Sequence, residues 1–200
     1  MPPTAQPPTI DLQGVRLRPL RMDDTPALLA YLQQPGVTEL TSFPTPSLAL
    51  AEGIIARATN RWAAGEPSKW GLALHGSDQL IGTCGFNEWS PVHRWAELAY
   101  DLATPHWGKG LMRQAVNAVL HWAFEQLRLG RIHAYVRTDN TRSKRLLERA
   151  GFAQEGRLRH FRVCRGQPHD FDVYALLDAE WARAHRAEEP SMAIGQTVHS

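Results

Sequence analysis

The fold is decided by the segment Thr104-Pro105-His106-Trp107-Gly108-Lys109-Gly110-Leu111-Met112-Arg113. It lies between an alternating run over residues 95–103, typical of a strand, and an amphipathic helix predicted over residues 110–127. Gly108 and Gly110 let the backbone approach a ligand closely, and the start of a helix leaves N–H groups without partners. The segment therefore indicates either a site for a phosphate or pyrophosphate, or a plain strand-to-helix turn.

Two well-known phosphate loops do not match this segment. A Walker A loop needs Ser or Thr directly after its Gly-Lys pair, whereas Gly110 and Leu111 follow Lys109 here. A dinucleotide-binding fingerprint needs a third glycine three residues after the second, and that position is Arg113. We therefore expect the segment to hold phosphates without belonging to either class.

Periodicity divides the rest of the chain into strands and helices around this segment. Strands are predicted over residues 10–20, 70–75, 80–86, 95–103, 131–137, 152–165 and 171–177. Helices are predicted after Asp23 or Asp24, from Ser47 to about Ala64, over 110–127 and 140–150, and in a short segment ending near His185. This order predicts an α/β fold whose mixed, mostly antiparallel sheet of six to seven strands is flanked by helices. Residues 1–9 are expected to be a disordered Pro-rich leader, 10–187 a single domain and 188–200 a loose tail.

Length and composition are those of one globular domain: 200 residues, of which 43% are hydrophobic and 21% charged. The two cysteines, Cys84 and Cys164, form neither a disulfide framework nor a four-cysteine zinc site. The nine histidines are scattered without metal-ligand spacing, so no metal is expected. No apolar run approaches the roughly 18 residues that a membrane span needs, and the N-terminus has no apolar signal region. We expect a cytoplasmic protein with no membrane partner.

Positive charge is concentrated in residues 128–165. That stretch holds ten Arg and Lys144 against three acidic residues, whereas the net charge of the whole chain is only +2. Such asymmetry points to an anionic partner: nucleic acid, a phosphorylated cofactor or an acidic protein. A nucleic-acid-binding protein is the main rival class, although the stretch contains no RNP-type aromatic run and no zinc finger, which makes nucleic acid the weaker expectation.

A second motif, Asp139-Asn140-Thr141-Arg142-Ser143, opens the helix predicted over residues 140–150. Asn140 is a favourable N-cap, and Gly151 is a favourable stop at the C-terminal end. Taken alone, a capped surface helix with a basic face explains this pattern without any function.

The order and spacing of the two motifs together resemble the GNAT acetyltransferase superfamily. Within it, the chain is most similar to the subgroup of ribosomal-protein N-terminal (alanine/serine) acetyltransferases and spermidine acetyltransferases, over roughly Val15 to Leu177. The segments that carry the resemblance are Arg16-Leu17-Arg18, Leu80-Ile81-Gly82, Glu97-Leu98-Ala99-Tyr100, Trp107-Gly108-Lys109-Gly110-Leu111-Met112, Asn140-Thr141-Arg142-Ser143 and Gly151-Phe152-Ala153-Gln154-Glu155-Gly156. The resemblance implies an N-acetyltransferase that moves acetyl from acetyl-CoA to a primary amine by direct attack.

The implied co-substrate is acetyl-CoA. By resemblance, backbone N–H groups of the Gly-rich turn would hold its pyrophosphate, and the end of the preceding strand would pair with its pantetheine arm. The candidates to neutralise its phosphates are Lys109, Arg113, Lys144 and Arg145. The residues implied in binding it are Leu102, Ala103, Thr104, Trp107, Gly108, Lys109, Gly110, Leu111, Met112, Arg113, Asn140, Ser143 and Arg145.

Direct transfer needs a base for the acceptor ammonium, a donor for the developing oxyanion and an acid for the leaving thiolate. Glu97 is the predicted base, directly or through water, and Glu88 is the runner-up; a backbone N–H near Leu102 is the predicted oxyanion donor. The tyrosine that often serves as the acid in this family is replaced by Leu147, so Ser143 is predicted to take that role, with water as the alternative. Asn140 completes the catalytic set. The alternatives are that Glu97 is an ordinary strand residue and that Ser143 only caps its helix.

The acceptor is expected to be a protein N-terminus or a small-molecule amine. Phe43, Trp70, Glu88 and Trp89 are predicted to line its pocket. Arg162 stands where some relatives carry a carboxylate, which weakens the case for a ribosomal-protein acceptor. The remaining alternative is a non-catalytic acyl-CoA-binding regulator of the same fold, and an exposed sheet edge would favour a homodimer.

Overall fold

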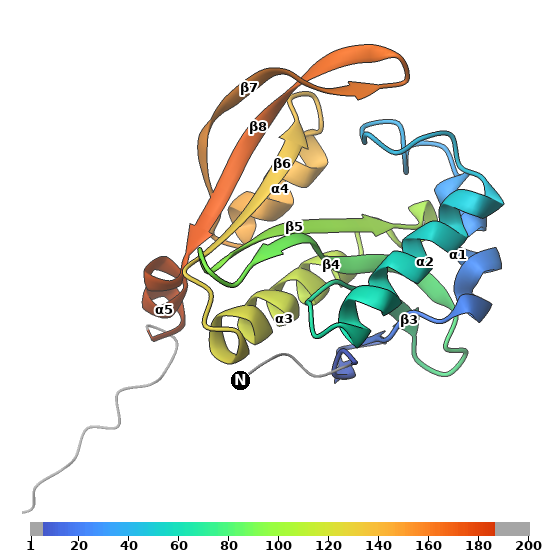
Figure 1. Cartoon of the computed structure of the whole chain (residues 1–200), viewed down its shortest axis with the longest axis horizontal. Helices are drawn as coiled ribbons and strands as arrows, with labels where there is room; N and C mark the ends of the chain where they lie inside the picture. Colours follow the sequence, from blue (N-terminus) through green and yellow to red (C-terminus); the bar gives the residue numbers. More distant parts are fainter. Residues whose placement is uncertain (1–5, 187–200) are drawn as a thin grey trace, which may run out of the picture.

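The computed structural model describes residues 6–186, which form one eight-stranded sheet with helices on both faces (Figure 1). The strand order is β1-β2-β3-β4-β5-β6-β8-β7. Every neighbouring pair is antiparallel except β5 and β6, which are parallel. The elements are β1 (Ile10–Asp11), β2 (Val15–Arg18), η1 (Met22–Asp24), α1 (Thr25–Leu32), α2 (Leu48–Ala63), β3 (Lys69–Leu74), β4 (Leu80–Ser90), β5 (Trp95–Leu102), η2 (Thr104–His106), α3 (Leu111–Gln126), β6 (Arg131–Arg137), α4 (Thr141–Arg149), β7 (Ala153–Cys164), β8 (Gln167–Leu177) and α5 (Asp178–Arg186).

The predicted α/β class and mostly antiparallel sheet are confirmed, but the sheet has more strands than predicted. The segment predicted as one strand over 10–20 folds as β1 and β2, because Gly14 turns the chain between them with a φ of 78°. Residues 6–9, predicted as part of a disordered leader, lie against the domain: the carbonyl of Pro8 accepts a hydrogen bond of 2.9 Å from the indole N–H of Trp70. The predicted tail from residue 188 lies outside the described residues.

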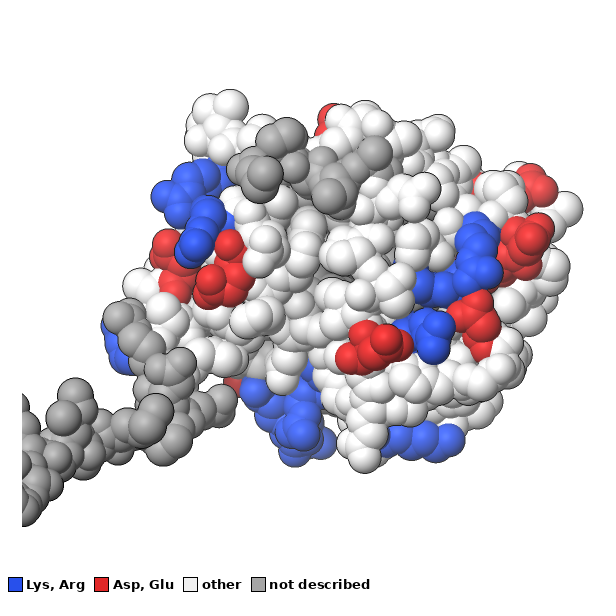
Figure 2. Space-filling view, turned by 90° about the horizontal axis from the view of Figure 1, so that it is seen from below, with Lys and Arg blue, Asp and Glu red and all other residues white. Residues whose placement is uncertain are grey.

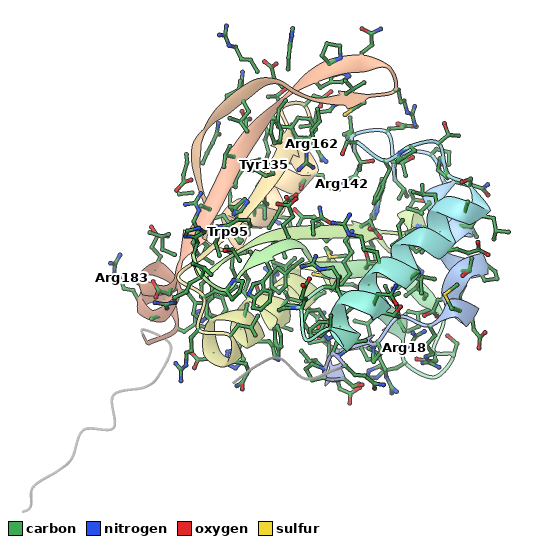
Figure 3. All side chains as sticks on the ribbon, viewed as in Figure 1. Arg18, Trp95, Tyr135, Arg142, Arg162 and Arg183 are labelled. Atoms are coloured by element: carbon green, nitrogen blue, oxygen red, sulfur yellow. The ribbon has the colours of Figure 1, made fainter. Side chains whose placement is uncertain are left out.

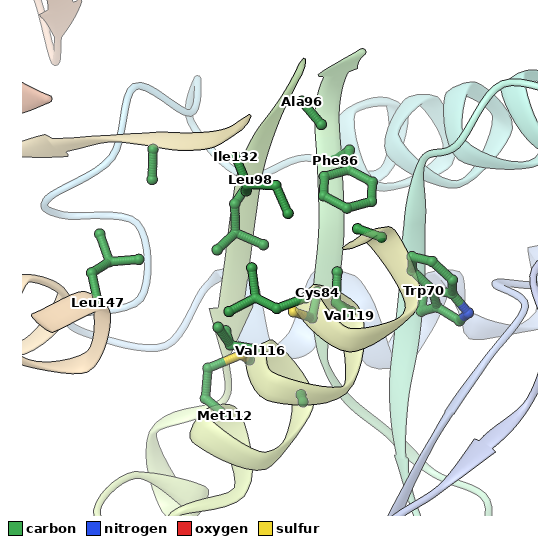
Figure 4. Close-up of a cluster of buried hydrophobic side chains, with 14 of the residues drawn as sticks. Trp70, Cys84, Phe86, Ala96, Leu98, Met112, Val116, Val119, Ile132 and Leu147 are labelled. Atoms are coloured by element: carbon green, nitrogen blue, oxygen red, sulfur yellow. The ribbon is translucent and has the colours of Figure 1, made fainter. Parts of the chain in front are cut away.

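Two clusters of buried side chains hold the layers together. One joins α3 to the sheet through Met112, Val116 and Val119, which pack against strand residues such as Cys84 and Phe86 (Figure 4). The other joins α1 and α2 to the sheet. Leu80 and Ile81 are adjacent on β4 but belong to different clusters. Since neighbouring strand residues point to opposite faces, α3 covers one face of the sheet, and α1 and α2 cover the other.

The sheet splits between β5 and β6. The two strands pair only at Trp95 with Arg131, Ala96 with Ile132 and Glu97 with His133. Beyond that point β6 continues beside β8 as far as Arg137 opposite Phe171, and Figure 1 shows β6, β8 and β7 rising away from β5. The edge of β5 that faces β6 is therefore left without a strand partner after Glu97, which opens a gap in the middle of the sheet.

The β7–β8 hairpin extends over this gap. Its register shifts between Leu158, which lies opposite Phe171, and Arg162, which lies opposite His169. His160, inside the shift, has a φ of 49°, and its N–H donates to the Asp170 carboxylate at 2.9 Å. Such a bulge turns side chains away from their regular direction, and here the residue after the bulge is Arg162.

Part of the charge in the basic stretch 128–165 is compensated within the fold. Arg131 pairs with Glu155, and Arg137 with Asp139, while Lys144 and Arg157 share Asp172. On the face seen from below in Figure 2, acidic and basic side chains lie next to one another. Across residues 6–186, no helix combines the length and the apolar character that crossing a membrane requires.

Candidate active site

A buried carboxylate, Glu97, lies at the point where the sheet divides. Its residue is 5% exposed, and it lines a pocket between the two halves of the sheet. One carboxylate oxygen, Oε1, accepts hydrogen bonds from the Asn87 amide at 3.1 Å and from the Arg162 guanidinium at 3.2 Å. Among the described residues no donor is recorded for the other oxygen, Oε2, which leaves that atom free to accept a proton.

The partner Asn87 owes its direction to a bulge in β4. Phe86 lies opposite Leu98 and Glu88 opposite Glu97, so Asn87 is the extra residue between the two pairs. Its backbone carbonyl accepts a hydrogen bond of 2.5 Å from Arg61 on α2. Helix α2 therefore fixes the bulge, and the bulge aims the Asn87 amide at Glu97.

The other partner, Arg162, reaches Glu97 from the β7–β8 hairpin. Its guanidinium lies over three aromatic rings, with centroid distances of 5.2 Å to Tyr135, 5.1 Å to Phe161 and 5.7 Å to Phe171. Figure 3 shows Arg162 and Tyr135 together between β5 and the hairpin. Cation–π contacts of this kind hold an arginine in place while leaving its N–H groups free to donate.

Ser143 lies across the gap, at the start of α4. The side chain of Asn140 caps this helix by accepting the Ser143 N–H at 3.1 Å, as its predicted N-cap character requires. The Ser143 hydroxyl is 2.5 Å from the hydroxyl of Tyr100 on β5. Burial raises the pKa of Tyr100 well above its usual value, so the phenol stays protonated and can donate to Ser143.

Glu97 and Tyr100 lie on opposite faces of β5. Positions 97 and 100 differ by an odd number, and alternate strand residues share a face. Leu98 packs in the cluster that contains α3, so Tyr100 faces α3 and α4, whereas Glu97 faces α1 and α2. The pocket that opens through the sheet is lined by both, together with Asn140 and Ser143. The structure thus brings the three predicted catalytic residues, Glu97, Asn140 and Ser143, into one pocket.

The Gly-rich turn forms an exposed helix start. Gly108 and Gly110 have φ values of 75° and 77°, and a Cβ at either position would meet no atom within 4 Å. Gly110 is the N-cap of α3 and, lacking a side chain, provides no side-chain cap. The first N–H groups of α3 therefore remain available to an anion. Lys109 and Arg113, which flank Gly110 in the sequence, are exposed, as is Arg145 on α4.

The end of β5 already uses several of its backbone groups. The carbonyl of Leu102 accepts the Trp107 indole N–H at 2.8 Å, Ala103 N–H donates to Ile81, and Thr104 N–H donates to the Gln34 side chain at 2.8 Å. Arg142, at the start of α4, stacks on Trp107 with 3.4 Å between its guanidinium carbon and the ring centroid. Pairing of a ligand with Leu102–Thr104, as predicted, requires these contacts to exchange. The free edge of β5 begins earlier, directly after Glu97.

Of the four residues predicted to line the acceptor pocket, Phe43 does so. Trp70 does not: it is fully buried and packs edge-to-face on Trp62 and Trp122. Glu88 is exposed, and Trp89 is partly buried against the core, and neither lines the pocket. The assignment of Trp70 is therefore wrong, because its side chain points to the α3 face of the sheet. The cofactor residues Leu111 and Met112 also contribute side chains to the core, so only their backbone faces the turn.

Most residues of the pocket lining were not predicted, and three of them matter for the site: Lys69, Asn87 and Tyr100. Tyr100 belongs to the segment Glu97-Leu98-Ala99-Tyr100 that carried the resemblance, and its aromatic type on a polar strand end was the available signal. Lys69 and Asn87 gave no signal, since their positions depend on the start of β3 and on the bulge in β4.

Comparison with known proteins identifies the family to which the chain is similar. The model of the acetyltransferase (GNAT) domain matches residues 15–153. An uncharacterized N-acetyltransferase p20 of Bacillus licheniformis is 32% identical over 87% of this chain and 98% of its own length. The ribosomal-protein-serine acetyltransferase of Escherichia coli is 33% identical over 52% of this chain and 58% of its own, and the spermidine N(1)-acetyltransferase of Vibrio cholerae is 31% identical over 51% and 59%.

Solved structures agree with the sequence relatives. A putative acetyltransferase from T. thermophilus is 31% identical, covers 92% of this chain and 98% of its own, and superposes with a TM-score of 0.72. Members of this family take acetyl from acetyl-CoA. The family model spans most of the domain and the p20 relative spans nearly its whole length, so the chain belongs to the GNAT acetyltransferase family and is an acyltransferase.

Proposed function

We propose that the protein acetylates a primary amine that enters the pocket from the face of α1 and α2. The observation that carries this proposal is the position of Glu97: a buried carboxylate, oriented by Asn87 and Arg162, beside a gap in the sheet that Ser143 borders from the other face. A base and a hydroxyl donor on opposite sides of one gap suit a reaction in which a proton is lost on one side and a leaving group departs on the other.

The residues around the Gly-rich turn fit acetyl-CoA. Its pyrophosphate matches the free N–H groups at the start of α3 and the exposed cations Lys109, Arg113 and Arg145. The unpaired edge of β5 offers backbone donors and acceptors to the pantetheine amides, as an added strand would. When bound, acetyl-CoA supplies an activated acetyl thioester.

Each catalytic residue then has one task. Glu97, directly or through a water, accepts the proton that the acceptor ammonium must lose before its nitrogen can form the new C–N bond. A backbone N–H near Leu102 donates to the oxygen that gains negative charge. The Ser143 hydroxyl donates to the sulfur as the C–S bond breaks, and Tyr100 holds that hydroxyl in position at 2.5 Å. Asn140 caps the helix that carries Ser143 and so holds the start of that helix in place.

Release of free thiol tests the proposal. Purified protein is mixed with acetyl-CoA and a panel of amines: the twenty L-amino acids, their carboxamides, short peptides and spermidine. We expect thiol release that depends on an amine, and a rise in melting temperature with acetyl-CoA but not with ATP or NAD. Stabilisation by acetyl-CoA without amine-dependent release over the whole panel would contradict catalysis and favour the acyl-CoA-binding regulator. The cytoplasmic location and the homodimer stay predictions.

A further inference from the structure

Lys69 is a buried cation that faces the pocket without a counter-ion. The residue is only 9% exposed and lines the same pocket as Glu97. The ammonium contacts the ring of Phe43, whose centroid is 5.6 Å from the nitrogen. Within residues 6–186, no hydrogen bond or ion pair of this ammonium is present. Lysine is almost never buried to this extent unless it is paired. The stem of Lys69 is covered by protein, whereas its ammonium nitrogen is not enclosed and keeps contact with the solvent of the pocket.

The carboxylates that line the pocket are committed to other groups. Glu97 accepts from Asn87 and Arg162. Asp101 accepts at Oδ1 from the Tyr31 hydroxyl at 2.5 Å and at Oδ2 from the Thr83 hydroxyl at 2.8 Å. The other two pocket cations also have partners, since Arg162 pairs with Glu97 and Arg137 with Asp139. Among the charged residues that line the pocket, Lys69 is therefore the one whose charge a ligand can neutralise.

The sheet register places Lys69 on the acceptor side of the gap. Lys69 lies opposite Gly85, and Gly85 lies opposite Ala99. Ala99 shares a strand face with Glu97, two residues away. No side chain stands between Lys69 and Ala99, because Gly85 has none, and a Cβ there would approach the Cα of Lys69 to 2.6 Å. Lys69 and Glu97 thus face one space, with a cation at one side and the predicted base at the other.

We propose that the acceptor carries a carboxylate next to its amine, as a free amino acid does, and that Lys69 binds that carboxylate while Glu97 receives the proton of the amine. This inference rests on the proposed acetyltransferase function and names its substrate class. The aromatic rings of Phe43, Tyr135 and Phe171 line the remaining wall and offer an apolar surface to the substituent of the amino acid. A polyamine is disfavoured, because it would place a further positive charge near Lys69.

The first test compares each acid with its own carboxamide, which removes only the negative charge. Binding of the twenty N-acetyl-L-amino acids and of their carboxamides is measured by calorimetry with CoA present, so that the readout does not depend on turnover. We expect at least one acid to bind about 10- to 100-fold more tightly than its carboxamide, the range typical of a hydrogen bond to a charged group. If no acid binds better than its carboxamide, the inference is overturned.

The second test removes the cation. Lys69→Met keeps the length of the side chain and should abolish the preference for the acid while leaving stabilisation by acetyl-CoA unchanged. Arg183→Met is the matched control, because Arg183 is an exposed cation on α5, away from the pocket (Figure 3), and it should keep the preference. A preference that survives in Lys69→Met would contradict the inference. The wild-type comparison needs no variant and stands even if Lys69→Met does not fold.

The two proposals fail in different ways. Acetylation of carboxamides, peptides or spermidine in preference to the acids would overturn the role of Lys69 while supporting an acetyltransferase. Selective binding of acids without thiol release would support Lys69 as a carboxylate site and contradict catalysis.

Discussion

At the scale of single residues, Glu97 is the group whose replacement tests the reaction most directly. Glu97→Gln keeps the size of the side chain and an oxygen for Asn87 and Arg162, but it cannot accept the proton of the acceptor. General-base catalysis contributes at least about 100-fold, so we expect kcat with the best amine to fall by about that factor while the KM for acetyl-CoA stays unchanged. Steady-state thiol release measures both.

Glu88→Gln is the control for this variant. Glu88 lies opposite Glu97 in the sheet but is exposed and outside the pocket. Its replacement should leave kcat within about twofold. A variant of Glu88 that loses activity as strongly as that of Glu97 would reassign the base to the runner-up.

Ser143 and Tyr100 make a second prediction, because the two hydroxyls have different tasks. Ser143→Ala removes the donor to the leaving sulfur and should lower kcat by about 10-fold or more. Tyr100→Phe leaves the Ser143 hydroxyl in place and removes only the partner that orients it, so its effect on kcat should be smaller. Single-turnover rates compare the two. Equal losses would indicate that Tyr100 acts on the reacting atoms itself.

The helix cap at Asn140 was predicted from residue types, because a cap depends on neighbours in the sequence. The place of Asn140 and Ser143 in the site was predicted only from the resemblance to the family. The contact between Ser143 and Tyr100 was not predicted, since it joins residues 43 positions apart and depends on how α4 lies against β5. The Glu97–Arg162 pair spans 65 positions and depends on a bulge in β7. Local chemistry was therefore predictable, whereas long-range pairing was not.

At the scale of the elements, two glycine variants can separate the effect of backbone strain from the effect on ligand binding at the Gly-rich turn. Gly110→Ala places a side chain at a φ of 77°, which costs about 1–2 kcal/mol. Gly14→Ala is a close match, because Gly14 has a φ of 78° and equally open surroundings but lies between β1 and β2. We expect similar losses of unfolding free energy in both variants, and weaker acetyl-CoA binding only in Gly110→Ala.

Urea unfolding and calorimetric titration with acetyl-CoA provide the two measurements. Equal affinity for acetyl-CoA in the two variants would show that the start of α3 does not hold the pyrophosphate.

The element scale also explains why Trp70 was misplaced. The sequence predicted a strand from Trp70, with the tryptophan beside a loop and near the acceptor. The strand starts at Lys69. Because adjacent residues of a strand point to opposite faces of the sheet, the face assigned to one residue fixes the direction of all the others. Trp70 faces α3 and joins the core, and Lys69 faces the pocket. Only the packing of β3 against α3 settles which of the two residues reaches the acceptor.

At the scale of the whole molecule, Asp172 connects the parts that surround the gap. It lies on β8 with no exposed side-chain surface, and it accepts from Lys144 on α4 at 2.5 Å and from Arg157 on β7 at 2.8 Å. Burial of the carboxyl opposes its ionisation, but the hydrogen bonds from Arg157 and Lys144 outweigh burial and lower the pKa of Asp172. This carboxylate therefore ties the helix that carries Ser143 to the half of the sheet that carries Arg162.

The lowered pKa makes this tie dependent on pH in a defined direction. An unfolded Asp has a pKa of about 3.9, so the stabilisation by ionised Asp172 is fully present above that value and is lost as pH falls through the lower pKa of the folded state. Asp172→Asn, which leaves Lys144 without its carboxylate, should lower the unfolding free energy at pH 7 by about 3 kcal/mol, as expected for one partner of a buried pair. The difference from wild type should shrink as pH falls below about 4.

Urea unfolding between pH 7 and the lowest pH at which the protein stays folded measures this difference, and Asp11→Asn, at an exposed carboxylate in β1, should change little at any pH. A deficit in Asp172→Asn that stays constant down to acid pH would show that loss of shape or hydrogen bonding, rather than loss of the charge, sets its stability, and the ionised carboxylate would then not be what holds α4 against β7 and β8.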